Sequence, residues 1–170
     1  PQEQGYIMAS NHVSDMDPVM LGLAFHKPLN FMAKEELFRI PVFNSIIRAL
    51  GAFPVARGKG DQAAIDHAVG IVKNGGGLGI FPEGTRFKDG KLHRLKSGAV
   101  VIAAKTGADV LPTCIRYEKR RFLRRHVKVV FGVPIKNHIL NLTEQSKSEL
   151  RAANKLLAEG IAELMGVEVP

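Results

Sequence analysis

A histidine and an aspartate five residues apart form the first group of residues with chemical potential. His12 and Asp17 lie in the segment 11–17 (NHVSDMD), directly after a predicted strand. Pro18 disfavours helix in the residue before it and suits the first position of a helix, so we expect Asp17 to cap a helix there. The turn then folds back, so that the Asp17 carboxylate accepts one imidazole N–H and leaves the other ring nitrogen of His12 free as a base.

A simpler interpretation of the same segment stays open. In that interpretation Asp17 is only a helix cap and His12 is an ordinary loop histidine, while Ser14 and Asp15 are competing caps. A metal site is disfavoured, because one histidine and one carboxylate without a third nearby ligand do not hold a metal ion.

The second group is the segment 81–86 (FPEGTR), at the end of the predicted strand 77–81. Glu83 and Arg86 follow a run that should be buried, at the carboxyl edge where open sheets bind ligands. Gly84 allows a tight turn or a close approach of the backbone to a ligand. An arginine oriented by Glu83 can grip a phosphate through two parallel hydrogen bonds. The alternative is a local ion pair between the two side chains at the surface.

Other segments carry weaker signals. Arg57 ends the segment 51–57 (GAFPVAR) and is either a second phosphate ligand or a solvated arginine. Residues 58–63 (GKGDQA) match a dinucleotide-binding pattern, but the run before them is short and contains Pro54, which suits an edge strand or a turn. Glycines 75–77 lack the Lys-Ser/Thr pair of a phosphate-binding P-loop, so we interpret them as the stop of a helix.

An alternation of apolar runs and helical patterns predicts the framework that positions these groups. It is typical of βαβ units, so we expect one α/β domain over residues 1–170, a mainly parallel sheet flanked by helices with the active site at the carboxyl edge of the strands. Strands are predicted over residues 6–9, 30–33, 77–81, 110–115 and 127–131. Helices are predicted over residues 18–25, 42–50, 61–73, 98–105 and 144–165, the last one capped by Thr143.

Size and composition limit the class of protein. A chain of 170 residues with 45% hydrophobic and 24% charged residues fits one folded domain and excludes disorder. Cys114 is the single cysteine, which excludes an internal disulfide and a Cys-rich zinc site, and its place in a predicted strand favours packing over a nucleophilic role. The longest apolar run, 99–104, is far shorter than the roughly 18 residues of a spanning helix.

The formal charge of +8 indicates an anionic partner: a nucleic acid, a phosphorylated metabolite or an acidic lipid surface. Seven basic residues and one acid lie between residues 116 and 128, with Phe122 and Leu123 among them. This stretch either rests on an anionic membrane or merely connects two strands. Apolar residues between 38 and 50 would add to membrane contact. A nucleic-acid-binding module is the remote alternative, but the chain has only two tyrosines, no tryptophan and no recognisable binding motif.

The order of these segments resembles the glycerophospholipid acyltransferase family, in particular its bacterial 1-acyl-sn-glycerol-3-phosphate acyltransferases. Segment 11–17 resembles the family's N-H-x-S-x-x-D block, and residues 34–37 (KEEL) together with 51–57 resemble the second block. Segment 81–86 resembles the third block in full, and residues 110–113 (VLPT) resemble the fourth.

The resemblance implies a reaction. His12 takes the proton of the acceptor's hydroxyl, Asp17 orients it, and the oxygen attacks a fatty-acyl thioester of coenzyme A or acyl carrier protein directly, without an acyl-enzyme and without a cofactor. The implied acceptor is the sn-2 hydroxyl of lysophosphatidic acid, which gives phosphatidic acid. Another lysolipid, such as a lyso-ornithine lipid, is the alternative acceptor.

The resemblance also implies binding residues and a location. The acceptor phosphate would be held by Arg57, Glu83, Gly84, Thr85 and Arg86, and the segment around Pro112 would line the acyl-donor side. Family members usually carry a hydrophobic or amphipathic segment ahead of the histidine block, and ten residues precede Asn11 in this sequence. We expect the protein to work at the cytoplasmic face of the inner membrane, bound peripherally or anchored by a segment absent from this chain.

Overall fold

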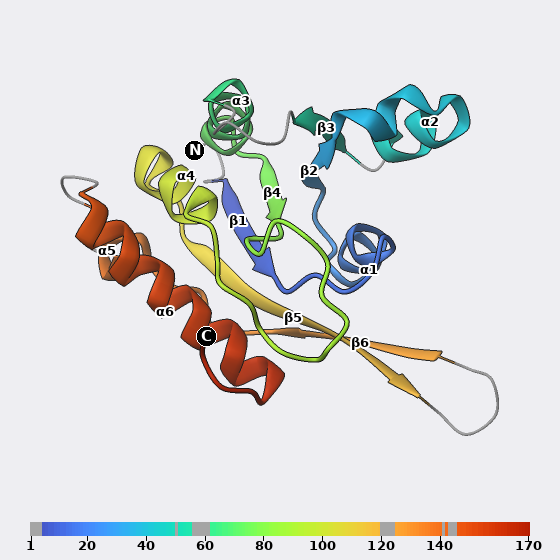
Figure 1. Cartoon of the computed structure of the whole chain (residues 1–170). Helices are drawn as coiled ribbons and strands as arrows, with labels where there is room; N and C mark the ends of the chain where they lie inside the picture. The colour runs from blue at the N-terminus through green and yellow to red at the C-terminus, as the bar shows by residue number, and fades with distance from the viewer. Residues whose placement is uncertain (1–4, 50, 56–61, 120–124, 141, 143–145) are drawn as a thin grey trace.

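A six-stranded sheet forms the centre of the molecule, as the computed structural model shows (Figure 1). The model describes residues 5–49, 51–55, 62–119, 125–140, 142 and 146–170. The strands lie in the order β3-β2-β4-β1-β5-β6; the first five are mutually parallel, and β6 pairs antiparallel with β5. The predicted α/β fold with a mainly parallel sheet flanked by helices is confirmed.

The strands match the five predicted ones with small shifts, and one is added. Their bounds are β1 (Tyr6–Ser10), β2 (Leu29–Lys34), β3 (Ala52–Val55), β4 (Gly77–Ile80), β5 (Val110–Lys119) and β6 (Arg125–Phe131). The added strand β3 contains Pro54 and lies at the sheet edge, where a residue without an N–H is tolerated.

The described residues of the basic stretch, 116–119 and 125–128, belong to strands, because β5 and β6 continue into it and pair from Thr113↔Phe131 to Lys119↔Arg125. Alternation explains this extension: Ile115 and Tyr117 pack in the apolar cluster under α1 (Asp17–Ala24), while the intervening Arg116 points to the opposite face, where it donates to a carbonyl near the C-terminus. Residues 120–124 lie outside the described residues.

The helices also follow the prediction, with a 3₁₀ turn and a short helix added. After α1 they are η1 (Glu35–Arg39), α2 (Pro41–Ala49), α3 (Gln62–Lys73), α4 (Gly98–Thr106), α5 (Asn137–Leu140) and α6 (Lys147–Met165). Helix α3 ends before Gly75, whose φ of 83° gives the predicted stop at the glycines. Among the described residues, no helix has both the length and the hydropathy to cross a bilayer.

The start of α6 differs from the prediction. The helix begins at Lys147, and Ser146 caps it: the Ser146 hydroxyl accepts from the Glu149 N–H, and the Glu149 side chain accepts from the Ser146 N–H. This reciprocal capping box satisfies two N–H groups at once, so the cap of α6 is Ser146. The predicted cap, Thr143, lies outside the described residues.

The core lies on both faces of the sheet. Ile7 and Ala9 of β1 point to the face covered by α3, α4 and α6, whereas Met8 between them points to the face covered by α1 (Figure 1). Residues 7–10 of β1 are buried. The segment that follows β1 is therefore held by a strand packed on both sides.

Candidate active site

The segment 11–16 connects β1 to α1 at the carboxyl edge of the sheet. Asn11, at its start, extends the strand ladder with its side chain: Nδ2 donates to the Ile115 carbonyl at 3.1 Å, and Oδ1 accepts from the Ile115 N–H at 2.8 Å. Asn11 is 3% exposed. This buried pair of bonds fixes the position from which His12 projects.

His12 and Asp17 are in direct contact. Nδ1 of His12 lies 2.8 Å from Oδ2 of Asp17, and the same oxygen accepts the backbone N–H groups of Val13 at 2.7 Å and Ser14 at 2.8 Å. Asp17 is not the predicted helix cap. It is the first residue of α1, Met16 occupies the cap position without a side-chain bond, and the carboxylate instead closes the loop that carries His12.

The Asp17 carboxylate is fully buried but well supplied with donors. Burial alone would raise the pKa of Asp17, but the hydrogen bonds from four partners outweigh it and hold the pKa below its ordinary value. The group is therefore an ionised acceptor. Because a carboxylate cannot donate, Nδ1 of His12 carries a proton, so in the neutral ring Nε2 is the nitrogen with the lone pair.

Tyr117 of β5 completes this arrangement. Its hydroxyl donates to Oδ1 of Asp17 at 2.6 Å. Burial, together with the neighbouring carboxylate, raises the pKa of Tyr117 to about 12, so the phenol stays protonated and remains a donor. The sequence offers no spacing signal for this contact, because 100 residues separate the two side chains.

A second aromatic ring covers one face of the His12 imidazole. Phe81, directly after β4, stacks on His12 with ring centroids 4.1 Å apart and planes inclined by 18°. The His12 carbonyl accepts the N–H of Phe87 at 2.8 Å. The His12 side chain is 16% exposed. The two sequence segments 11–17 and 81–86 therefore meet, as their predicted positions at one sheet edge require.

Glu83 does not orient Arg86, contrary to the prediction. Its side chain is 5% exposed, with Oε2 accepting the N–H of His12 at 2.8 Å and Oε1 accepting the N–H of His93 at 3.0 Å. Burial raises the pKa of Glu83, although these two hydrogen bonds oppose the shift. The carboxylate accepts from these two backbone segments because each contributes a partly buried N–H that needs an acceptor. Glu83 thus ties the His12 loop to the loop before α4.

Arg86 pairs instead with Asp15 of the His12 loop, and both side chains are well exposed. Gly84 has a φ of 71°, which favours glycine, and its backbone is closely approached by the side chain of Lys96. Thr85 is exposed beside them. The described part of the predicted phosphate site therefore lies next to His12, whereas Arg57 lies outside the described residues.

Pro112, predicted beside the acyl donor, is buried in β5. It pairs with Ala9 of β1, and its ring lies against Gly160 of α6, where a Cβ would come within 3.0 Å of the proline side chain. Its side chain thus packs under a helix, and its contact with a donor stays a prediction.

Known proteins share both this sequence pattern and this fold. A family model described as acyltransferase matches residues 1–116. The 1-acyl-sn-glycerol-3-phosphate acyltransferase of Borreliella burgdorferi is 31% identical over 88% of this chain and 63% of its own length. The protein of the same name from Bacillus subtilis is 31% identical over 96% of this chain and 83% of its own length.

A solved structure agrees with the sequence relatives. The crystal structure of the 1-acyl-sn-glycerophosphate (LPA) acyltransferase PlsC from Thermotoga maritima matches with a TM-score of 0.70 at 30% identity, covering all of this chain and 70% of that one. This chain spans less than two thirds of the length of the Borreliella relative described above. The family-model match covers most of the chain, and it shows that the protein belongs to the acyltransferase family.

Proposed function

We propose that the protein transfers a fatty-acyl group from an acyl thioester to the sn-2 hydroxyl of 1-acyl-sn-glycerol-3-phosphate. The observation that carries this proposal is the contact between His12 and Asp17, which leaves Nε2 of His12 free as a base at the carboxyl edge of the sheet. The similar proteins from Borreliella burgdorferi, Bacillus subtilis and Thermotoga maritima are 1-acylglycerophosphate acyltransferases, which supports this choice of acceptor.

The proposed reaction needs one base. Nε2 of His12 takes the proton of the acceptor hydroxyl while the hydroxyl oxygen attacks the thioester carbonyl, forming the ester C–O bond. The C–S bond then breaks, and the leaving thiolate takes the proton back from the imidazolium. Asp17 stabilises the imidazolium that forms between these steps, with its own position fixed by Tyr117 and the Val13 and Ser14 N–H groups.

Direct attack, without an acyl-enzyme, is the favoured course. Cys114 is buried in β5, and burial raises the pKa of its thiol, which disfavours the reactive thiolate. Ser14 is engaged in the loop, where its hydroxyl accepts the N–H of Met16 at 3.2 Å. The acceptor's own hydroxyl is then the nucleophile that His12 activates.

The acceptor phosphate is proposed to bind at Arg86, with Arg57 as a second ligand. Arg86 can form paired hydrogen bonds to phosphate oxygens, and Asp15 holds its side chain beside the His12 loop. Because the acceptor is a lipid, we further propose that the enzyme works on the cytoplasmic surface of the inner membrane.

Release of free thiol tests this proposal. Acyl-coenzyme A or acyl carrier protein thioester is incubated with the protein, with and without lysophosphatidic acid, and thiol is followed over time. We expect release that depends on both the acceptor and His12, with phosphatidic acid as product. Thiol release at the same rate with and without lysophosphatidic acid, or no release with either donor, would contradict the proposal.

A further inference from the structure

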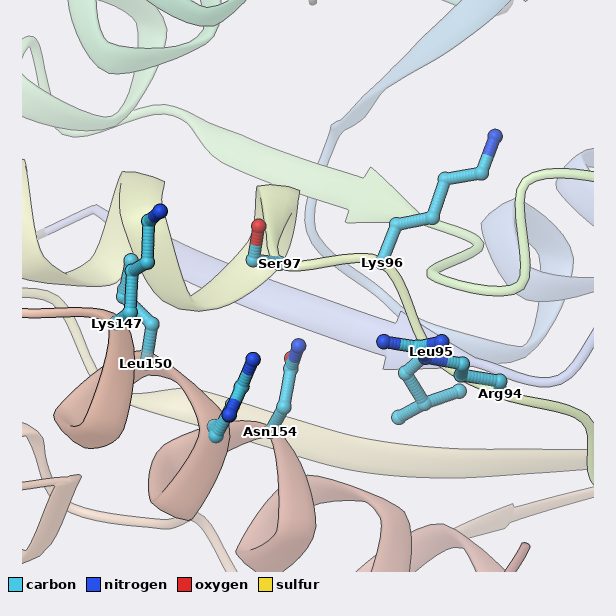
Figure 2. Close-up of a pocket in the computed structure, with 8 residues that line it drawn as sticks. Arg94, Leu95, Lys96, Ser97, Lys147, Leu150 and Asn154 are labelled. Carbon is cyan, nitrogen blue, oxygen red and sulfur yellow. The ribbon is translucent and has the colours of Figure 1, made fainter.

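A basic pocket of about 510 Å³ lies between the loop that enters α4 and the first turns of α6 (Figure 2). Figure 2 places Lys147, Leu150 and Asn154 on α6, opposite Ser97 at the start of α4. The eight residues that line the pocket include four basic and no acidic ones: Arg94, Leu95, Lys96, Ser97, Lys147, Leu150, Arg151 and Asn154.

The four cations have no acidic partner among the residues that the structure describes. Gathering like charges around one concavity costs free energy through mutual repulsion. Lys147 adds to this cost, because it occupies the first turn of α6, where the helix dipole disfavours a cation. A bound anion with several charges would offset both terms.

Two polar features make the pocket suitable for phosphate. The nine-residue helix α4 starts at the pocket, and its cap residue Ser97, which lines the pocket, makes no side-chain bond to the first N–H groups. The N-terminus of a helix favours an anion. Asn154 is the second feature. It lines the pocket, and the NH₂ group of its amide can donate a hydrogen bond to a phosphate oxygen.

Lys96 connects the pocket to the reaction centre. Its backbone N–H donates to the Pro82 carbonyl at 2.8 Å, and its ammonium passes so close to Gly84 that a Cβ there would lie 2.7 Å from Nζ. The loop that carries Glu83 and Arg86 thus contacts Lys96, which also lines the pocket.

We propose that this pocket binds the phosphate groups of coenzyme A in the acyl donor. The inference rests on the proposed function for the thioester chemistry, and it adds a binding site for the donor's carrier. Four cations and a helix N-terminus suit a ligand with several phosphates, whereas the acceptor has a single phosphate, for which Arg86 lies in the loop next to the His12 loop. A concave site also suits a compact ligand better than a flat lipid surface.

Calorimetric titration with coenzyme A, in the absence of acceptor, tests the pocket independently of turnover. The variants are Arg94→Gln, Lys147→Gln and Arg151→Gln, and the control is Lys155→Gln, since Lys155 lies on α6 outside the pocket, 3.8 Å from Glu159. We expect each pocket substitution to weaken coenzyme A binding about 10-fold and two together about 100-fold. The control should leave binding unchanged, and the phosphate-free pantetheine arm should bind all variants equally.

Kinetics on the same variants separate this inference from the proposed function. We expect KM for acyl-coenzyme A to rise with the dissociation constant, while KM for lysophosphatidic acid stays constant. Unchanged coenzyme A affinity in all three variants would overturn the pocket and leave the acyltransferase intact. A loss seen only with acyl carrier protein, or only in binding to anionic vesicles, would likewise overturn it. Weakened coenzyme A binding by a protein that never transfers an acyl group would uphold the pocket and reject the function.

Discussion

Replacing Glu83 with glutamine separates its observed contacts from the role that the sequence suggested. The carboxylate accepts one backbone N–H at each oxygen, from His12 at 2.8 Å and from His93 at 3.0 Å. Glutamine keeps the shape of the side chain but has a single acceptor oxygen, so its NH₂ group must face one of these N–H donors. Either the His12 N–H or the His93 N–H then loses its hydrogen-bond acceptor.

The size of the effect follows from these contacts. A buried hydrogen bond to a charged acceptor contributes about 1.5–3 kcal/mol. Removing the charge returns part of this loss, because burial raises the pKa of Glu83 and so opposes its ionisation. We expect a net destabilisation of about 1–2 kcal/mol, which corresponds to a fall in Tm of about 2–8 °C for a chain of this length. Because the His12 loop shifts, kcat should fall about 10- to 100-fold.

Thermal unfolding and steady-state kinetics on two acceptors measure both effects. The control is Glu163→Gln, an exposed glutamate on α6. For Glu83→Gln we expect the lower Tm together with an equal loss of kcat for phosphorylated and phosphate-free acceptors. An unchanged Tm with a KM effect confined to the phosphorylated acceptor would refute the reasoning and restore Glu83 to the phosphate site.

Three further substitutions test the neighbouring contacts. Asp17→Asn presents an amide that can donate to Nδ1, which takes the base away from Nε2, so kcat should fall about 10²- to 10⁴-fold. The pKa of Asp17 is lower in the folded protein than its unfolded value of about 3.9, so the ionised carboxylate stabilises the fold above that pH. The difference in free energy of unfolding between the wild type and Asp17→Asn should therefore shrink as the pH falls through the folded pKa. A difference that stays constant in an acid denaturation series would contradict this. Tyr117→Phe leaves Oδ1 of Asp17 buried without its donor and should cost about 1.5–3 kcal/mol in urea unfolding, whereas an unchanged midpoint would deny the contact any energetic role. Arg86→Ala should raise KM about 10-fold for the phosphorylated acceptor alone, with Arg39→Ala as the surface control, and equal losses on both acceptors would rule out a phosphate contact.

Local chemistry explains which features the sequence could predict. The apolar runs locate the central strands, and Pro18 places the start of α1 to within one residue, because both signals act within a few residues. The contact of His12 with Asp17 could be predicted for the same reason, since the two residues are only five positions apart in the sequence. The placement of segments 11–17 and 81–86 together follows from a general rule for parallel sheets and needs no knowledge of side chains.

Contacts between distant segments explain the rest. Tyr117 reaches Asp17 because β5 lies beside β1 and extends beyond it, and the extension of β5 depends on its pairing with β6. Glu83 turns away from Arg86 because the backbones at His12 and His93 need a buried acceptor, which no short-range pattern reveals. The basic pocket likewise joins residues of the loop before α4 to residues of α6, some 50 positions later.

The most direct measurement of the central claim is single-turnover acyl transfer by His12→Ala, with His126→Ala as the control for an exposed histidine on β6. If Nε2 of His12 is the base, the variant should transfer the acyl group about 10²- to 10⁴-fold more slowly, with unchanged affinity for lysophosphatidic acid and an unchanged Tm, while the control keeps the wild-type rate. Transfer by His12→Ala at a rate near that of the wild type would contradict the account.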